Sequence, residues 1–236
     1  MVAALQPGVL HLAELNAGDS SRASHVWRVD GPGGLWVARR PWWTTPEVSA
    51  FMSGLGGLFG VDPRDLGSVT EAYALWRELD AWAVPQTLGV RAVLGAPALG
   101  VEWVDGEGSR PLADADAGEL GRRVAHVHAR TRDTFGPLSG GQGWPLAAFY
   151  PRALAVLGDL TARFDAALWV GVWPQLRPML EQAPAPSQAV PLLLDWSGGQ
   201  FVWRDGQPFA LVDVEASVFG PPELDLCSWE GALSPA

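Results

Sequence analysis

One segment, Leu192–Leu226, constrains the fold of this chain more than any other. It reads LLLDWSGGQFVWRDGQPFALVDVEASVFGPPELDL, in which a short apolar strand runs into Asp195 and a Gly-rich turn. A hairpin then turns at Asp205-Gly206, and its return strand leads straight into Asp213. Because a hairpin brings the chain back to where it started, we expect both carboxylates at its mouth, with Gln200 between them.

Two carboxylates and an amide oxygen form the oxygen donor set that Mg²⁺ prefers, with waters and phosphate oxygens as its other ligands. In phosphoryl transfer, one aspartate can orient the attacking hydroxyl while the other, with the amide, holds the metal on the phosphates. This pattern predicts Asp195 as the catalytic residue and Gln200 with Asp213 as the metal site. The alternative is that each aspartate is only a turn residue.

Strand patterns dominate the first hundred residues. His25–Val29 and Leu35–Arg39 flank Asp30–Gly34, a sequence typical of a hairpin turn. Val90–Val104 predicts two more strands, broken at Gly95–Pro97.

Two other segments lie between these strands. The Gly-rich run Ser53–Gly60 predicts a loop, and it does not meet the context of a dinucleotide-binding loop because no clear strand precedes it. Thr70–Trp82 carries Ala72, Leu75, Trp76 and Leu79 at helical spacing and predicts an amphipathic helix.

Helical patterns dominate the second half. A helix is expected over Asp114–Arg130, with Leu120, Val124 and Val127 on one face. Further helices are expected over Leu146–Leu168 and before the Pro-rich stretch at 183–186, and Asp105–Gly108 is expected to be a linker. The sequence therefore predicts an α+β protein with two lobes. Residues 1–103 form a β-rich lobe, and residues 104–236 form a mainly helical lobe that contains the small hairpin.

Composition excludes several classes of partner. The formal net charge of -10 and the pI of about 4.7 argue against a nucleic-acid binder, because phosphate backbones demand a basic face. No apolar run is long enough to span a bilayer. The single cysteine, Cys227, excludes an internal disulfide, fits a cytoplasmic location, and is expected to be buried.

Residue usage adds three expectations. All 16 basic residues are Arg, so a site that requires lysine is absent. Most of the 13 Trp residues lie within apolar patterns and are expected in the core. His126 and His128 are two positions apart on a predicted helix, so they are expected to pack separately rather than share a metal.

The C-terminal motifs resemble those of the aminoglycoside phosphotransferase and choline kinase-like family, a branch of the protein-kinase fold. Its catalytic loop reads H-G-D-x-x-x-x-N, and its metal aspartate lies in an I-D-W-E-like stretch followed by G-D-P-x-x-D-L. Here the three corresponding segments are 193–200 (LLDWSGGQ), 212–215 (VDVE) and 220–226 (GPPELDL). The resemblance implies Asp195 as the catalytic aspartate, Gln200 in place of the metal-binding Asn, Asp213 as the metal aspartate and Asp225 as a buried brace of the catalytic loop.

The resemblance extends upstream. Residues 70–89 are similar to the family's helix-then-Pro segment, which implies that Glu71 pairs with the phosphate-binding basic residue. That residue falls at Arg39, or at its neighbour Arg40, in place of the family's lysine. The family's phosphate loop corresponds to 16–22, which implies that Ser20 and Ser21 steady the phosphates. GVEWVDGE at 100–107, with Glu102, is similar to the strand whose backbone meets adenine, and 124–138 is similar to the family's "L-A-x-L-H-A … F-G" helix.

These observations predict an ATP-dependent phosphotransferase that uses Mg²⁺ and acts on the hydroxyl of a small molecule. The acidic chain suits a cationic acceptor. A second hypothesis is a catalytically inactive protein of the same fold that binds a nucleotide or a protein partner, which the absence of lysine and the Leu193-Leu194 pair favour. A third is a glycosidase, in which Asp213 and Glu215 would face the same side of one strand.

Overall fold

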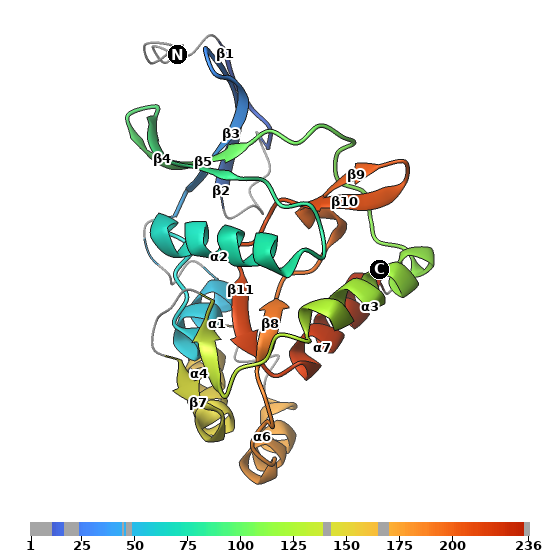
Figure 1. Cartoon of the computed structure of the whole chain (residues 1–236). Helices are drawn as coiled ribbons and strands as arrows, with labels where there is room; N and C mark the ends of the chain where they lie inside the picture. The colour runs from blue at the N-terminus through green and yellow to red at the C-terminus, as the bar shows by residue number, and fades with distance from the viewer. Residues whose placement is uncertain are drawn as a thin grey trace. The chain divides into compact units, whose positions relative to one another are not determined.

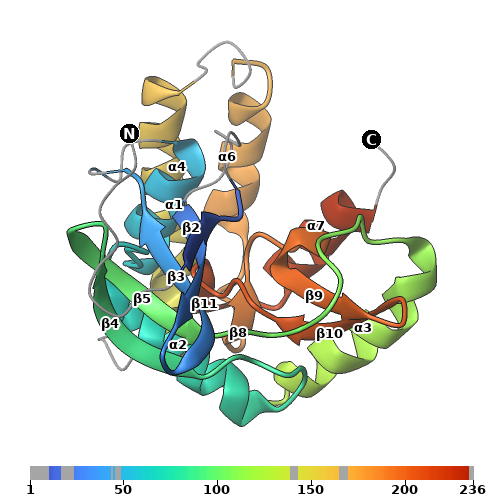
Figure 2. The ribbon, with the colours of Figure 1, turned by 90° about the horizontal axis from the view of Figure 1, so that it is seen from above.

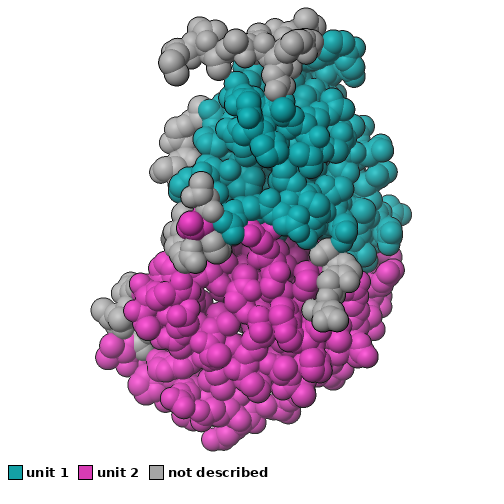
Figure 3. Space-filling model, turned by 90° about the vertical axis from the view of Figure 1, so that its left-hand side faces the viewer, with its two compact units in different colours: residues 1–44, 63–111, 197–215 teal, residues 45–62, 112–196, 216–236 magenta. Residues whose placement is uncertain are grey.

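The structure is a computed structural model, and it describes residues 11–16, 24–43, 45, 49–138, 143–164 and 170–233. Its contacts divide the chain into two compact units, each assembled from three segments. Unit 1 comprises residues 1–44, 63–111 and 197–215, and unit 2 comprises 45–62, 112–196 and 216–236 (Figure 3). The lobes predicted at 1–103 and 104–236 stay a prediction. In the described part of the chain, no helix is long and apolar enough to cross a membrane.

Unit 1 is built on a five-stranded antiparallel sheet of order β1-β2-β3-β5-β4 (Figure 1). Both predicted hairpins are present, the first closed at Gly34 (φ 97°) and the second at Leu94-Gly95 (φ 51° and 77°). Left-handed backbone at these turns explains why Gly stands at two of the three positions. The strands are β1 (His11–Glu14), β2 (Ser24–Gly31), β3 (Gly34–Pro41), β4 (Thr87–Val93) and β5 (Ala96–Glu102).

The sheet is covered on both faces at its centre. Ala38 lies in a core cluster with Trp27 and Val29, whereas the next residue, Arg39, points to the opposite face because side chains alternate along a strand. Arg39 pairs in register with Leu99 of β5, so the two side chains share that face. Helix α2 (Leu66–Leu79) packs against β4 and β5.

Helix α2 begins four residues earlier than predicted. Asp65 caps it by accepting a hydrogen bond from the Gly67 amide at 3.0 Å, and Ser68 donates to the same carboxylate. The predicted apolar stripe is confirmed, since Ala72, Leu75, Trp76 and Leu79 are all buried. The early start moves Glu71 into the second turn of the helix, where it is exposed.

Aromatic rings connect α2 to the C-terminal hairpin of the same unit. Trp76 contacts Trp82 with centroids 6.2 Å apart, and Trp82 contacts Phe201 at 5.7 Å. The hairpin pairs β9 (Phe201–Arg204) with β10 (Gln207–Leu211) around the predicted Asp205-Gly206 turn, at φ 49° and 74°. The Leu211 amide also donates to the Ala83 carbonyl at 2.9 Å.

The segment 105–108 was expected to be a linker, but it contacts strand β9 of this hairpin. Glu107 pairs with Trp203 through two backbone hydrogen bonds of 2.8 and 3.1 Å, so the segment adds a short edge to β9. The conformation of this segment is set by its backbone hydrogen bonds to β9, and its linker-like composition does not decide it.

In its described residues, unit 2 combines five helices with a four-stranded sheet of order β7-β6-β11-β8. Helices α1, α4 and α6 pack in sequence, α1 against α4 and α4 against α6 (Figure 2). The buried stripe predicted for α3 is confirmed at Leu120, Val124 and Val127. The elements are α1 (Ala50–Phe59), α3 (Asp114–Val127), β6 (Thr134–Pro137), β7 (Trp144–Pro145), a 3-10 turn (Leu146–Ala148), α4 (Phe149–Arg163), α6 (Trp173–Gln182), β8 (Val190–Leu193), β11 (Ser217–Gly220) and α7 (Glu223–Leu233).

The prediction of a loop in the Gly-rich run is wrong, because this run lies in helix α1. Ser49 caps its start by accepting from the Met52 amide, and Gly60 ends it with left-handed backbone (φ 68°). A Cβ on Gly57 would lie 3.1 Å from Val156 of α4. The glycines thus allow two helices to approach closely, and this packing offsets their low helix propensity.

We predict that Gly106→Ala destabilises the protein by about 1–3 kcal/mol, the usual cost of overpacking. A Cβ there would lie 2.6 Å from the Trp203 carbonyl oxygen, against backbone that cannot move aside easily. Gly108→Ala is the matched control, since its Cβ would meet nothing within 4 Å. Urea unfolding of the two variants measures the difference, and equal stabilities would contradict the pairing of this segment with β9.

Candidate functional site

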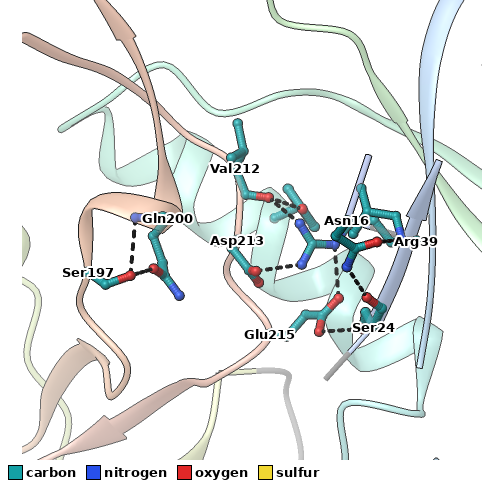
Figure 4. Close-up of polar contacts among 11 residues, drawn as sticks. Asn16, Ser24, Arg39, Ser197, Gln200, Val212, Asp213 and Glu215 are labelled. Carbon is teal, nitrogen blue, oxygen red and sulfur yellow. Dashed lines mark hydrogen bonds and ion pairs between the residues drawn. The ribbon is translucent and has the colours of Figure 1, made fainter. Parts of the chain in front are cut away.

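The polar centre of unit 1 is Arg39, on the middle strand of the sheet and only 6% exposed (Figure 4). Its Nε donates to Glu215 Oε1 at 3.0 Å, and one terminal nitrogen lies 2.7 Å from Asp213 Oδ2. The other terminal nitrogen donates to the Val212 carbonyl at 3.0 Å. Each nitrogen of the guanidinium is therefore bound to the segment that follows β10.

Glu215 is held at both ends of its carboxylate. Its Oε2 accepts from the Ser24 hydroxyl at 3.1 Å, while Oε1 accepts from Arg39. Ser24 begins β2, and its carbonyl accepts from the Asn16 side-chain amide at 2.7 Å. Asn16 also accepts from the Val26 amide at 3.1 Å. The network thus joins Asn16 and Ser24 to Arg39 through Glu215.

Tyr73 brings α2 into the network. It is fully buried, and its hydroxyl donates to the Val212 carbonyl at 2.6 Å, the same oxygen that accepts from Arg39. One carbonyl with two donors holds the backbone immediately before Asp213.

Charge and burial oppose each other here. Burial lowers the pKa of the Arg39 guanidinium, but the carboxylates of Asp213 and Glu215 outweigh it and hold that pKa well above its ordinary value. Burial raises the pKa of Glu215, and the nearby Asp213 charge adds to this, whereas Arg39 opposes both. Burial also raises the pKa of Tyr73, which keeps its phenol a neutral donor. Arg39 is therefore a permanent buried cation.

Gln200, predicted as a metal ligand, is buried and belongs to the same unit as Asp213. Its carbonyl accepts from the Val212 amide at 2.8 Å, which makes it a neighbour of the Asp213 segment. Its side-chain oxygen accepts a short hydrogen bond from Ser197, the cap of the 3-10 turn Gly198–Gln200. Asp213 is about a quarter exposed.

The carboxylates that pair with Arg39 differ from the predicted partner, Glu71. Glu71 lies on the exposed side of α2, and in the described part of the chain the ion-pair partners of Arg39 are Asp213 and Glu215. The helix instead contributes Tyr73, two residues on, which binds the Val212 carbonyl that Arg39 also binds. Arg40 lies apart from this network, donating to the Val93 carbonyl at 3.2 Å and stacking over Trp27.

Three further residues, Glu102, Ser20 and Ser21, were predicted as nucleotide-binding residues. Glu102 ends β5 as an exposed residue, and its carboxylate accepts from the Gln86 amide at 3.3 Å. Ser20 and Ser21 lie outside the described residues. Asp213 and Glu215 do not lie on one strand, because β10 ends at Leu211.

Asp195, the predicted catalytic residue, belongs to unit 2 and lies half-buried in the turn after β8. The adjacent Trp196 donates from its indole to Asp225 Oδ1 at 2.8 Å, and His128 Nε2 lies 2.9 Å from Asp225 Oδ2. Asp225 is 1% exposed, and burial raises its pKa while His128 and Trp196 lower it. Asp225 thus ties the turn after β8 to the end of α3.

Two other sequence predictions can be compared with the structure. His126 is exposed and His128 binds Asp225, so the two histidines pack separately as expected. The prediction of a buried Cys227 is wrong, because this residue lies on the exposed side of α7. In the described residues, no group of three or more His, Cys, Asp or Glu side chains could hold a metal by itself.

Ser24 and Tyr73 were not predicted as site residues, and Glu215 was named only as one of the paired acids of the glycosidase hypothesis. The available signal was Glu215, two positions after the predicted metal aspartate in a segment otherwise made of apolar residues. A charged residue in such a segment needs a buried partner. No comparable local signal marks Ser24 or Tyr73.

We predict that Arg39→Met lowers the free energy of unfolding by about 3–5 kcal/mol, because it leaves Glu215 buried without its cation. Arg77→Met, at an exposed position of α2, should cost less than about 1 kcal/mol. Urea unfolding at neutral pH compares the two variants with wild type. Similar small losses in both would show that the Arg39 ion pairs contribute nothing to stability.

No protein-family model matches this sequence, and no curated protein matches it. The backbone, in contrast, matches solved structures over nearly its whole length. One is aminoglycoside phosphotransferase APH(4)-Ia, at 15% identity and a TM-score of 0.61, covering 95% of this chain and 74% of that one. A thermostable mutant of that enzyme in a ternary complex with ADP and hygromycin B matches at 17% identity, a TM-score of 0.59 and the same coverage.

A third match is a macrolide 2'-phosphotransferase from Brachybacterium faecium, at 16% identity and a TM-score of 0.53, covering 99% of this chain and 81% of that one. At such identities the likeness establishes the fold. The chain therefore has the α+β, protein-kinase-like fold that these small-molecule phosphotransferases share, as the order of its motifs predicted.

Proposed function

We propose that this protein is an ATP-dependent phosphotransferase that transfers a phosphoryl group to a hydroxyl of a small molecule. The observation that carries the proposal is the 2.7 Å contact between Arg39 on the central strand and Asp213 after the hairpin. A buried cation beside a partly exposed carboxylate suits a nucleotide phosphate and its metal. The fold shared with phosphotransferases supports the same reaction class.

The donors of unit 1 fit Mg²⁺. Asp213 supplies a carboxylate and Gln200 an amide oxygen, and Mg²⁺ takes few protein ligands because it keeps waters and phosphate oxygens around it. In this proposal Asp213 and Gln200 hold the ion, and Arg39, with Ser20 and Ser21, binds the phosphates. Glu102 and its neighbours in β5 meet the adenine through their backbone. When bound, the ion would neutralise charge on the transferred phosphoryl group.

The reaction itself is a simple displacement. The acceptor hydroxyl oxygen bonds to the γ-phosphorus, the bond from that phosphorus to the bridging oxygen breaks, and ADP leaves. Asp195 orients the hydroxyl and takes its proton. The net charge of -10 favours cationic acceptors, since an acidic surface attracts them by long-range steering. A cytoplasmic location, where ATP is plentiful, belongs to the same proposal.

A second candidate function is nucleotide or partner binding without catalysis. The observation that favours it is the complete engagement of Arg39, whose three nitrogens bind Glu215, Val212 and Asp213. The side-chain oxygen of Gln200 is likewise bound to Ser197. A site in which these groups are already satisfied within the chain gives less to a ligand.

We predict that Mg·ATP raises the melting temperature by several degrees. A ligand at a hundred times its dissociation constant stabilises the folded state by about 2.7 kcal/mol, and each kcal/mol corresponds to about 2–4 °C at this size. The shift should need Mg²⁺ and vanish in Asp213→Asn, whereas Asp159→Asn, on the exposed side of α4, should retain it. A wild-type melt unmoved by ATP, ADP and GTP would contradict both nucleotide-binding functions.

We predict that Asp195→Asn lowers phosphotransfer about 10²–10⁴-fold while leaving the nucleotide-induced melting shift in place, because general-base catalysis contributes on this scale. ADP release in the presence of a panel of hydroxyl compounds, including aminoglycosides such as hygromycin B and macrolides, measures turnover. Asp159→Asn again serves as control. Nucleotide binding without turnover on any acceptor would favour the non-catalytic function.

A further inference from the structure

Arg39 is held by a carboxylate that lies outside helix α2. Its Nε–H donates to Glu215 Oε1, and the Ser24 hydroxyl donates to Glu215 Oε2 (Figure 4). Both oxygens of this carboxylate are therefore hydrogen-bonded, which fixes its orientation. The side chain of Glu215 is 11% exposed and that of Arg39 is 7% exposed. A charged pair this deeply buried has a defined geometry, because either group alone would pay a large desolvation cost.

Helix α2 contributes to this centre through a neutral side chain. Glu71 is exposed, and Tyr73 donates to the Val212 carbonyl beside the Arg39 nitrogen. The helix therefore fixes the backbone that carries Asp213, and it leaves the orientation of the guanidinium to another group.

We propose that Glu215 is the positioning residue for Arg39, in the place where the resemblance implied Glu71. The inference rests on the proposed function, since it concerns how Arg39 is presented to the nucleotide phosphates. Glu215 touches neither nucleotide nor acceptor in this scheme. It acts through the guanidinium, whose plane it sets by binding Nε.

The carboxylate of Glu215 gives Arg39 a second counter-charge besides Asp213. Arg39 carries one positive charge, while Asp213 and Glu215 together carry two negative ones. If Asp213 held a metal ion, Arg39 would keep Glu215 as its counter-charge. With a single acid, metal binding would leave a buried guanidinium unpaired, which is strongly unfavourable. Glu215 thus frees Asp213 for the metal.

The arrangement also reaches the segment that precedes β2. Asn16 and Ser24 flank residues 17–23, and the Ser24 hydroxyl is the second donor to Glu215. Glu215 consequently contacts both Arg39 and Ser24, the first residue of β2.

The first test needs no nucleotide. The Arg39 Nε–H resonance, assigned by its loss in Arg39→Lys, is recorded by ¹⁵N NMR in wild type, Glu215→Gln and Glu71→Gln, with the exposed Glu78→Gln as control. In Glu215→Gln we expect a shifted resonance and hydrogen exchange at least about tenfold faster, the scale of one charge-assisted hydrogen bond. Glu71→Gln should resemble Glu78→Gln. A resonance that moves in Glu71→Gln and stays in Glu215→Gln overturns the proposal.

The second test measures the dissociation constant of Mg·ADP by calorimetry, at a temperature where every variant is folded. Glu215→Gln should bind about tenfold more weakly than wild type, and Glu71→Gln as tightly as Glu78→Gln. Equal affinities in Glu215→Gln and wild type overturn the positioning role. Failure of wild type to bind Mg·ADP overturns the proposed function, whereas the Nε resonance still decides which carboxylate holds Arg39.

A milder variant covers the case in which Glu215→Gln does not fold. Ser24→Ala removes the hydroxyl that fixes Glu215 Oε2 and leaves every charge in place. We expect a smaller shift of the Arg39 Nε resonance in the same direction. An unchanged resonance in folded Ser24→Ala overturns the inference.

Discussion

The ion pairs of one buried arginine organise the candidate site. Arg39 cannot lose its charge, and it lies on the middle strand of a sheet covered on both faces, so the fold must bring it anions. It obtains them from the chain that follows the C-terminal hairpin, more than 170 residues later in sequence. This requirement explains why residues 197–215 belong to the same compact unit as the N-terminal sheet.

Apolar packing makes the approach possible. The row Trp76, Trp82 and Phe201 joins α2 to β9, and the pairing of Glu107 with Trp203 fixes the hairpin's other edge. Large aromatic surfaces of this kind dominate core energetics, so they contribute much of the packing that holds the hairpin against α2. The ion pairs then select one position of the segment 212–215 among those that packing allows.

The family resemblance and the structure agree on the fold and differ in the partner of the basic residue. Arginine in place of lysine brings five donors instead of three, so one carboxylate does not satisfy it. Glu215, Asp213 and the Val212 carbonyl together do. The segment after β10 thus meets the donors of Arg39, and α2 contributes through Tyr73, which binds the Val212 carbonyl.

The sequence by itself determined the elements whose signals are local. Alternation and turn residues predicted the hairpins of β2–β3 and β9–β10, and apolar spacing predicted the buried faces of α2 and α3. Motif order predicted the kinase-like fold. Only the tertiary structure decided that the Gly-rich run is helix α1, because the close approach of α4 rather than propensity stabilises it. Likewise, only the tertiary structure paired Arg39 with Glu215 instead of Glu71, because an ion pair between distant segments depends on which side chains share a buried face.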